Sequence, residues 1–346
     1  MERLDFIVYG ATGYTGEYVA REIIKESKSK NYKVGLAGRN LEKLQSVLNR
    51  IKKSESTDSE VKLIIANIEN EQEINEMTAK CSILINCVGP YQLYGEVVVK
   101  SCLKTNTHHL DISGEPTYLE KMQVLYNEEA IKQNVIVIGA CGGDSVPAEA
   151  GFEYTERNCN QPLAFIESFL SIKDRYAIHS TTLESALCSF KNRKSLKKNR
   201  RAIFDGVREP TRPEASMLKY DEYSKTWCIP FMGSDLSVVR RTQRALLSKK
   251  DNFVHYVPYL CIGSKFKAIL GLFFGVWFAF IVSNPLTRAF AVKFPSLATF
   301  GLFSSQGAKR EEIEKATFEM TFHGIKREND YEKCMIITTI NGPEAE

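Results

Sequence analysis

Short apolar runs alternate with amphipathic stretches through the first half of the chain. The apolar runs are residues 4–9, 33–37, 61–66, 82–88, 109–112 and 135–138. The stretches between them carry apolar residues at helical spacing, and the runs recur at intervals of about 20–30 residues. This alternation predicts an α/β fold over residues 1–150, with a doubly wound parallel sheet covered by helices on both faces.

After residue 150 the pattern changes, and longer strands become the main signal. Residues 165–172 read as a strand. Residues 317–322 and 334–340 read as an antiparallel pair joined by a charged turn. We therefore expect a second domain of α+β class over residues 151–346.

One stretch of the second half is long and apolar. Residues 268–287 form a run of 20 residues without a charge, and Asn284-Pro285 marks a sharp stop. A helix that spans a bilayer needs about 20 such residues, so the length is borderline. Three alternatives stay open: contact with a membrane or lipid-droplet surface, a true span, and a helix buried in the protein core.

Residues 191–201 hold seven basic residues and no acidic ones. A solvated or disordered loop is the default interpretation of such a run. The alternative is binding to anionic lipid head groups, where each basic residue contributes about 1 kcal/mol. We expect no nucleic-acid partner, because the run lacks interleaved aromatic residues and the net charge is only +4.

The composition is that of a globular protein, with 43% hydrophobic and 25% charged residues over a chain of 346. Nine cysteines are scattered without a C-x-x-C pair. They predict buried free thiols in a reducing compartment, and neither a disulfide framework nor a metal site. Met1-Glu2-Arg3 leads directly into the first apolar run, so we expect no signal peptide.

A glycine turn joins the first apolar run to the first helical stretch. It reads Gly10-Ala11-Thr12-Gly13-Tyr14-Thr15-Gly16, with the spacing G-x-x-G-x-x-G. The first glycine permits the turn, the second lets the backbone approach a pyrophosphate, and the third lets the helix pack closely on the sheet. With the hydroxyls of Thr12 and Thr15 as added donors, the turn predicts a dinucleotide cradle and a Rossmann-like sheet.

The second strand ends in Gly38-Arg39-Asn40, with Lys43 one helical turn later. Folds that bind NAD usually place an acidic residue here for the ribose 2′-hydroxyl. A guanidinium suits a 2′-phosphate instead. Arg39 and Lys43 therefore favour NADP(H) over NAD(H), with a solvated surface arginine as the alternative.

Further cofactor contacts are expected where the third and fourth strands end. Asn67 follows the third strand, at a junction that commonly faces the adenine ring. The fourth strand continues into the turn of Cys87, Val88, Gly89 and Pro90. Ligands of such folds bind at this carboxyl edge of the sheet.

No catalytic residue stands out in the sequence. Four residues are candidates only because they fall at the carboxyl edge of the predicted sheet, namely Tyr91, Asp111, Glu115 and Asp144. Asp111 and Glu115 have an alternative as caps or ion-pair partners. Asp144 and Ser145 precede Pro147, which is typical of a helix N-cap. His108 and His109 show no partner in the sequence and are interpreted as structural.

Several phrases of the sequence match one known family. The matching phrases are Gly10–Gly16, Ala37–Arg39, Asn86–Tyr91, Asp111–Pro116, Gly143–Pro147, Ile229–Asp235 and Ser237–Arg244. They occur in order across both halves, up to Gly342-Pro343-Glu344-Ala345. The chain therefore resembles the saccharopine dehydrogenase-like oxidoreductases, and the last two phrases resemble the animal members in particular.

The resemblance implies an NADP-binding domain followed by an α+β domain whose sheet is a substrate or homodimer face. The family is also similar to bacterial trans-acting enoyl reductases of complex lipid synthesis. It thus implies an NADP(H)-dependent oxidoreductase with a hydrophobic or lipid-like substrate, acting in lipid or glycolipid metabolism. The expected locations are intracellular: a lipid droplet, a membrane or the mitochondrion. A non-catalytic NADP-binding scaffold or sensor at a lipid surface is the alternative, and true saccharopine dehydrogenase activity ranks last.

The chain departs from the family pattern at two places. Asn67 stands where relatives often have aspartate, which puts the strength of the adenine contact in doubt. The chain ends at Glu346, whereas family members continue beyond this point. The resemblance therefore implies that a C-terminal portion of the family is absent from the second domain.

Overall fold

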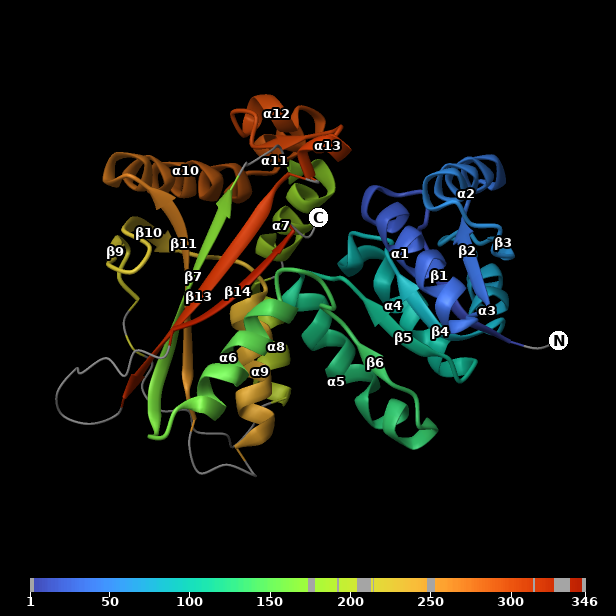
Figure 1. Cartoon of the computed structure of the whole chain (residues 1–346), viewed down its shortest axis with the longest axis horizontal. Helices are drawn as coiled ribbons and strands as arrows, with labels where there is room; N and C mark the ends of the chain where they lie inside the picture. The colour runs from blue at the N-terminus through green and yellow to red at the C-terminus, as the bar shows by residue number, and fades with distance from the viewer. Residues whose placement is uncertain are drawn as a thin grey trace. The chain divides into compact units, whose positions relative to one another are not determined.

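The computed structural model describes residues 3–173, 178–191, 193–203, 213, 215–247, 253–313, 315–326 and 337–343. The chain divides into two compact units, each built around its own sheet (Figure 1). Unit 1 comprises Met1–Cys141 and Asn192–Asn199, and unit 2 comprises Gly142–Lys191 and Arg200–Glu346.

Unit 1 contains a parallel sheet of six strands. The strands are β1 (Leu4–Tyr9), β2 (Val34–Gly38), β3 (Val61–Ile65), β4 (Cys81–Asn86), β5 (His108–Asp111) and β6 (Val137–Ile138). Their order across the sheet is β3-β2-β1-β4-β5-β6, and every pair is parallel. The predicted doubly wound, Rossmann-like fold class is confirmed.

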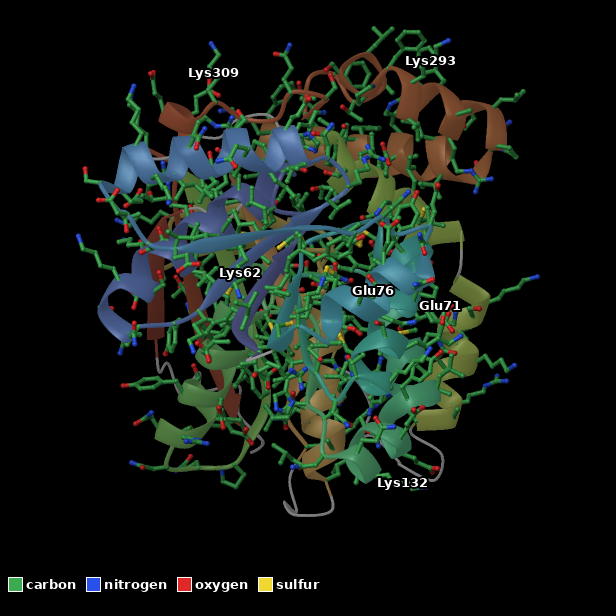
Figure 2. All side chains as sticks on the ribbon, turned by 90° about the vertical axis from the view of Figure 1, so that its right-hand side faces the viewer. Lys62, Glu71, Glu76, Lys132, Lys293 and Lys309 are labelled. Atoms are coloured by element: carbon green, nitrogen blue, oxygen red, sulfur yellow. The ribbon has the colours of Figure 1, made fainter. Side chains whose placement is uncertain are left out.

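Helices cover both faces of this sheet. They are α1 (Tyr14–Lys30), α2 (Leu41–Glu55), α3 (Glu71–Thr78), α4 (Tyr91–Lys104) and α5 (Pro116–Gln133). Residues of α1 and α2 share one apolar cluster with β1 and β2. Residues of α3 and α4 share a second cluster with β1 and β4. Burial on both faces explains why these strands are nearly continuous apolar runs. Charged side chains such as Lys132 of α5 point outward (Figure 2).

Unit 2 contains a mixed sheet of six strands. They are β7 (Leu163–Lys173), β9 (Lys219–Asp221), β10 (Thr226–Pro230), β11 (His255–Gly263), β13 (Thr317–Lys326) and β14 (Ile337–Pro343). The order is β14-β13-β7-β11-β10-β9. A short parallel pair, β8 (Ile178–His179) with β12 (Phe303–Ser304), lies apart from this sheet. The predicted strand at 165–172 is confirmed, and so is the predicted antiparallel pairing, now seen as β13 with β14. Residues 323–326, expected in the turn, extend β13 instead, and residues 327–336 lie outside the described part of the chain.

Several helices belong to unit 2. They are α6 (Val146–Asn158), α7 (Ser180–Lys191), α9 (Asp235–Leu246), α10 (Lys265–Ser283), α11 (Pro285–Lys293), α12 (Pro295–Ala298) and α13 (Arg310–Ile313). An apolar cluster joins α6 and α9 to the central strands. A second cluster joins α7 and α10–α12 to one another.

The basic run of residues 191–201 is not the loop that we expected by default. Most of it lies in α8 (Arg193–Ile203), and Lys191 ends α7. Lysine, arginine and leucine are good helix formers, and this propensity decides the local structure even though the charges repel one another. Residue 192 lies outside the described part of the chain.

The apolar stretch of residues 268–287 forms most of α10 and the start of α11. By length and composition α10 could cross a membrane. Only Ala268 and Ile281 of this helix are buried, so the buried-core alternative is wrong.

Candidate functional site

The predicted cofactor residues of unit 1 gather at the carboxyl edge of its parallel sheet. The glycine turn follows β1, Arg39 follows β2, and Cys87 follows β4. The strand order reverses between β1 and β4, because β2 lies on one side of β1 and β4 on the other. Ligands of open α/β sheets bind in the crevice at such a reversal.

The glycine turn is built so tightly that side chains cannot enter it. Gly10 has φ +84°, and a Cβ there would lie 2.8 Å from Cγ2 of Val88. A Cβ on Gly16 would lie 2.1 Å from the carbonyl oxygen of Gly10. On Gly13 the corresponding distance is 3.2 Å. The turn therefore leaves its backbone bare, as the approach of a pyrophosphate requires.

Helix α1 begins at this turn without a side-chain cap. Gly13 occupies the N-cap position and supplies no side-chain hydrogen bond. By contrast, the Asn40 and Asn70 side chains cap α2 and α3. An uncapped helix start leaves backbone N–H groups for an anion. Thr12, Tyr14 and Thr15 surround these groups and are each half-buried.

Arg39 and Lys43 lie at the end of β2 and in the first turn of α2. Both are exposed. Within the described part of the chain, neither side chain forms an ion pair or a hydrogen bond. Folds of this class hold the ribose near the end of this strand, and cations there suit a 2′-phosphate.

Asn67 lies just beyond the end of β3. Its backbone N–H donates to Oε2 of Glu73 at 2.8 Å. Its side-chain Oδ1 accepts from the backbone N–H of Glu69 at 3.3 Å. To form a hydrogen bond with an adenine ring, the Asn67 side chain would use its amide nitrogen, or its Oδ1 would accept a second hydrogen bond.

The turn after β4 contains a buried donor that its neighbours do not use. Oδ1 of Asn86 accepts from the backbone N–H of Val88 at 3.0 Å. Nδ2 of Asn86 has no partner among the described residues, although the side chain is fully buried. The peptide bond between Gly89 and Pro90 is cis. A buried donor at the reversal of strand order fits a polar ligand, because burying an unpaired amide costs free energy.

Asp111 holds the backbone at the end of β5. Its Oδ1 accepts from the N–H groups of Ser113 at 2.9 Å and of Ala140 at 3.1 Å. Its Oδ2 accepts from the hydroxyl of Tyr118 at 3.0 Å. Burial, and then the charge of Asp111, raises the pKa of Tyr118 well above its ordinary value. The structure therefore gives Asp111 a structural task in addition to its candidate role.

Glu115 caps the start of α4 from a distance in sequence. Its Oε1 and Oε2 accept from the backbone N–H groups of Tyr91 and Gln92, each at 2.9 Å. The side chain is 1% exposed. The hydroxyl of Tyr91 donates to the carbonyl of Asn86 at 3.0 Å, and burial raises the pKa of Tyr91 well above its ordinary value. The carboxylate thus fixes the turn that carries residues 87–90.

We expect Glu115→Gln to destabilise unit 1, because an amide can accept from only one of the two N–H groups. A buried donor left without a partner costs about 1–3 kcal/mol. Urea unfolding of the variant and the natural chain measures the difference in the free energy of unfolding. Glu128→Gln is the matched control, since Glu128 is exposed on α5, and it should change little. Equal stability of both variants would contradict the capping role.

Asp144, the fourth catalytic candidate, lies in unit 2. Its Oδ2 accepts from the backbone N–H of Ser234 at 2.9 Å and from its hydroxyl at 2.6 Å. Ser145 is the N-cap residue of α6, as predicted, but its side chain makes no cap bond. Its hydroxyl lies 3.0 Å from that of Ser234 instead. Asp144 therefore ties the start of α6 to the start of α9.

A buried carboxyl that the sequence did not reveal follows Ser234. Asp235 is fully buried, and its Oδ2 accepts from the hydroxyl of Tyr256 at 3.3 Å. The Tyr256 hydroxyl also lies 2.6 Å from that of Ser168. Burial, and then the charge of Asp144, raises the pKa of Asp235 well above its ordinary value. In the sequence, only the family resemblance of the phrase Gly233-Ser234-Asp235 could have pointed to the hydrogen bonds around Asp235.

The two histidines that the sequence led us to interpret as structural both lie in β5. Nδ1 of His108 accepts from the backbone N–H of Ile136 at 3.0 Å. His109 is fully buried, and burial lowers its pKa. Among the described residues, no group of three His, Cys, Asp or Glu side chains could hold a metal ion.

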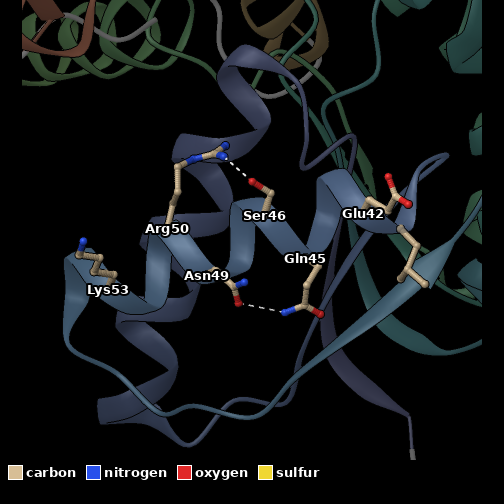
Figure 3. Close-up of a pocket in the computed structure, with 7 residues that line it drawn as sticks. Glu42, Gln45, Ser46, Asn49, Arg50 and Lys53 are labelled. Atoms are coloured by element: carbon tan, nitrogen blue, oxygen red, sulfur yellow. Dashed lines mark hydrogen bonds between the residues drawn. The ribbon is translucent and has the colours of Figure 1, made fainter.

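A hollow of about 720 Å³ lies along α2 (Figure 3). Its lining residues are Leu41, Glu42, Gln45, Ser46, Asn49, Arg50 and Lys53. All seven belong to one helix. Two pairs of them form hydrogen bonds, Arg50 with Ser46 at 2.9 Å and Gln45 with Asn49 at 3.0 Å. The hollow includes neither the glycine turn nor Arg39, so we do not assign the cofactor to it.

Comparison with known proteins places these features in a family. Residues 6–138 match the family model described as the saccharopine dehydrogenase NADP binding domain. The matched range contains the glycine turn, Arg39 and the turn after β4. The chain is 38% identical to the saccharopine dehydrogenase-like oxidoreductase of Rattus norvegicus, over 98% of this chain and 84% of that protein.

More distant relatives cover the chain equally well. The "Lipid droplet localized protein" of Caenorhabditis elegans is 30% identical over 100% of this chain and 86% of its own length. The "Probable mitochondrial saccharopine dehydrogenase-like oxidoreductase" of Arabidopsis thaliana is 30% identical over 98% of this chain and 84% of its own length. Among solved structures, apo saccharopine dehydrogenase (L-Glu forming) from Saccharomyces cerevisiae has a TM-score of 0.53 at 13% identity, covering 98% of this chain and 86% of that chain.

Proposed function

This chain belongs to the saccharopine dehydrogenase-like oxidoreductases, and from that premise we propose that it is an NADP(H)-dependent oxidoreductase with a hydrophobic, lipid-like substrate. One observation supports the cofactor most strongly. The bare glycine turn and the uncapped start of α1 lie at the same sheet edge as Arg39 and Lys43, two cations without an ion pair among the described residues. A pyrophosphate and a 2′-phosphate need these two features together.

The residues of unit 1 bind and orient the cofactor in this proposal. Backbone N–H groups of the glycine turn hold the pyrophosphate, and Arg39 and Lys43 hold the 2′-phosphate. The turn of residues 87–90 lies beside the nicotinamide half. When bound, the nicotinamide supplies or accepts the hydride, and the protein contributes orientation and electrostatics.

Three of the four catalytic candidates serve best as positioning residues. Tyr91, Asp111 and Glu115 are buried, and each has a hydrogen bond that fixes the backbone of the sheet edge. Asp144 differs, because it is exposed and only Oδ2 is bound by Ser234. Asp144 therefore stays a catalytic candidate from the sequence alone.

Turnover is the direct test of the proposed reaction. The chain is mixed with NADPH and with lipid-like enones, ketones or aldehydes, and the loss of nicotinamide absorbance is followed. We expect oxidation of NADPH with at least one such acceptor. Tight NADPH binding without turnover on any acceptor would contradict the enzyme and favour the second candidate, a non-catalytic NADP-binding scaffold or sensor. Saccharopine with NADP⁺ and NAD⁺ tests the last alternative, for which we expect no turnover.

A lipid surface is the proposed place of action, and α10 supports it. One stripe of this helix carries large exposed apolar side chains at helical spacing: Phe266, Leu270, Phe273, Trp277 and Phe280. Phe273 is 68% exposed, and neighbouring Val276 is 70% exposed. Leu286, Phe294, Leu297 and Phe300 continue the exposed apolar surface through α11 and α12. Apolar patches of this kind mark interaction sites on proteins or membranes.

The opposite stripe of α10 packs on unit 2. Ile281 lies in the apolar cluster with Leu183 and Ala291. A Cβ on Gly271 would lie 3.1 Å from Cδ1 of Ile229 in β10. A span would break these contacts, so we propose that α10 lies in the plane of the surface.

The charges around α10 suit an anionic surface. Between Asp251 and Glu311 the sequence holds six lysine or arginine residues and no aspartate or glutamate. Lys293 and Lys309 extend outward from the ribbon (Figure 2). The relative named for lipid droplets supports a droplet location, and the relative named as mitochondrial supports a mitochondrial location. No relative described above is named for a glycolipid, so we propose a lipid-like substrate and nothing finer.

We expect the double change Phe273→Ser and Val276→Ser to weaken lipid binding at least tenfold. Each side chain removed from lipid contact forfeits about 1.5–3 kcal/mol. Flotation with emulsions coated with phosphatidylcholine and phosphatidylserine measures the bound fraction. Leu125→Ser with Ile131→Ser is the matched control, because both residues are exposed on α5 of unit 1. Equal flotation of the two double variants would contradict the assignment of α10.

A further inference from the structure

Two cysteines face each other across neighbouring strands of unit 2. Cys228 of β10 and Cys261 of β11 are register partners in an antiparallel pair. Their Sγ atoms lie 3.3 Å apart. Both are free thiols in the structure and both are buried. Neither belongs to the proposed cofactor site.

The strand geometry already satisfies most requirements of a disulfide. Facing residues of an antiparallel pair have Cα atoms about 4.5–5.5 Å apart. Disulfides span Cα distances of about 4.4–6.8 Å, with sulfurs about 2.05 Å apart. The two sulfurs therefore need to approach by a little over an ångström, which side-chain rotation supplies. The register break between Trp227 and Cys228 gives β10 local freedom to adjust.

The surroundings of the pair favour one sulfur as the attacking group. The two thiols lie within hydrogen-bond distance of each other, and the hydroxyl of Thr226 lies 3.5 Å from Sγ of Cys228. The hydrogen bond from Cys228 lowers the pKa of Cys261, and further hydrogen bonds from Thr226 and Ser224 act in the same direction. A thiolate is the reactive form of cysteine. We take Cys261 as the attacking thiol and Cys228 as the resolving thiol.

We propose that Cys228 and Cys261 are an oxidation site, at which hydrogen peroxide converts the thiol pair to an intrachain disulfide. The Cys261 thiolate attacks one peroxide oxygen, which forms a sulfenic acid and releases water after protonation. Sγ of Cys228 then attacks the sulfenic sulfur, and a second water leaves. Two thiols and one peroxide thus give one disulfide and two waters, and the peroxide takes both electrons.

The disulfide would cross-link β10 to β11 near the residues on which α10 packs. Helix α10 follows β11 after Ser264, and Ile229 of β10 packs at Gly271 of α10. The bond would close a loop between two positions 33 residues apart, which restricts the unfolded chain. Oxidation is therefore expected to raise the melting temperature of unit 2 without changing the affinity of unit 1 for NADPH.

The test uses the full chain treated with hydrogen peroxide, followed by alkylation, digestion and mass spectrometry. We expect a peptide pair linked through Cys228 and Cys261, which dithiothreitol separates. In Cys228→Ser the link should be lost, and dimedone should label Cys261 as a sulfenic acid. Cys102→Ser is the control, since Cys102 is buried in unit 1, and it should keep the link.

Exposed Cys141 reports whether peroxide has reacted with the chain. If Cys141 is oxidised while Cys228 and Cys261 both remain open to alkylation after unfolding, the proposal is wrong. It is also wrong if Cys261 reaches the sulfinic acid in the natural chain without forming the link. A melting temperature of the oxidised chain equal to that of Cys228→Ser would contradict the predicted fastening of the strands.

Discussion

Gly16→Ala is expected to weaken NADPH binding by at least about 100-fold, or about 2.7 kcal/mol. The added Cβ would lie 2.1 Å from the carbonyl oxygen of Gly10. The contact involves backbone on both sides, so no side-chain rotation relieves it. Either the start of α1 or the turn must move, and the N–H groups that face the pyrophosphate move with it. Fluorescence titration with NADPH measures the loss.

The control for this variant is another helical glycine with open space around it. A Cβ on Gly275 of α10 meets nothing within 4 Å among the described residues. Gly275→Ala should therefore leave NADPH affinity unchanged. Circular dichroism shows whether Gly16→Ala still folds. If that variant is unfolded, Gly13→Ala replaces it, because its added Cβ would make a milder contact of 3.2 Å. Full affinity in both Gly13→Ala and Gly16→Ala would overturn the assignment of the turn.

Arg39→Ala is expected to change cofactor preference. We expect NADPH affinity to fall about 10–100-fold, because a charged hydrogen bond to phosphate contributes about 1.5–3 kcal/mol. NADH lacks the 2′-phosphate, so its affinity should stay the same. Parallel titrations with both cofactors give the ratio of the two dissociation constants.

Lys62→Ala is the matched control for Arg39. Lys62 lies on β3, is exposed and is labelled in Figure 2. Removing this cation changes the net charge as Arg39→Ala does, without touching the end of β2. It should leave the preference for NADPH intact. A similar fall for both variants would mean that Arg39 acts only through the general field of the unit.

The strands of unit 1 could be predicted because a strand that is buried on both faces has a continuous run of apolar residues. β4 reads as a continuous apolar run, and Asn86 ends it where the turn begins. The glycine turn could also be predicted from the sequence, because the spacing of its glycines follows from backbone contacts within a few residues. Arg39 was identified as a candidate by its position at the end of β2, and its role in cofactor binding stays a prediction.

Contacts between segments far apart in the chain could not be predicted from the sequence. Glu115 binds the start of α4, 24 residues earlier, and Asp144 binds Ser234, 90 residues later. No local pattern records such pairs. The helix α8 was missed for another reason, because a run of like charges was given more weight than the helix propensity of lysine and arginine. The pairing of Cys228 with Cys261 likewise depends on strand register.

We propose an NADP(H) site at the glycine turn and Arg39 of unit 1, and calorimetric titration of the unmodified chain tests that proposal most directly. The chain is titrated with NADPH and, separately, with NADH under the same conditions. We expect one site per chain, with NADPH bound at least about tenfold more tightly, which corresponds to about 1.4 kcal/mol. Equal affinities, tighter binding of NADH, or no binding of either cofactor would contradict it.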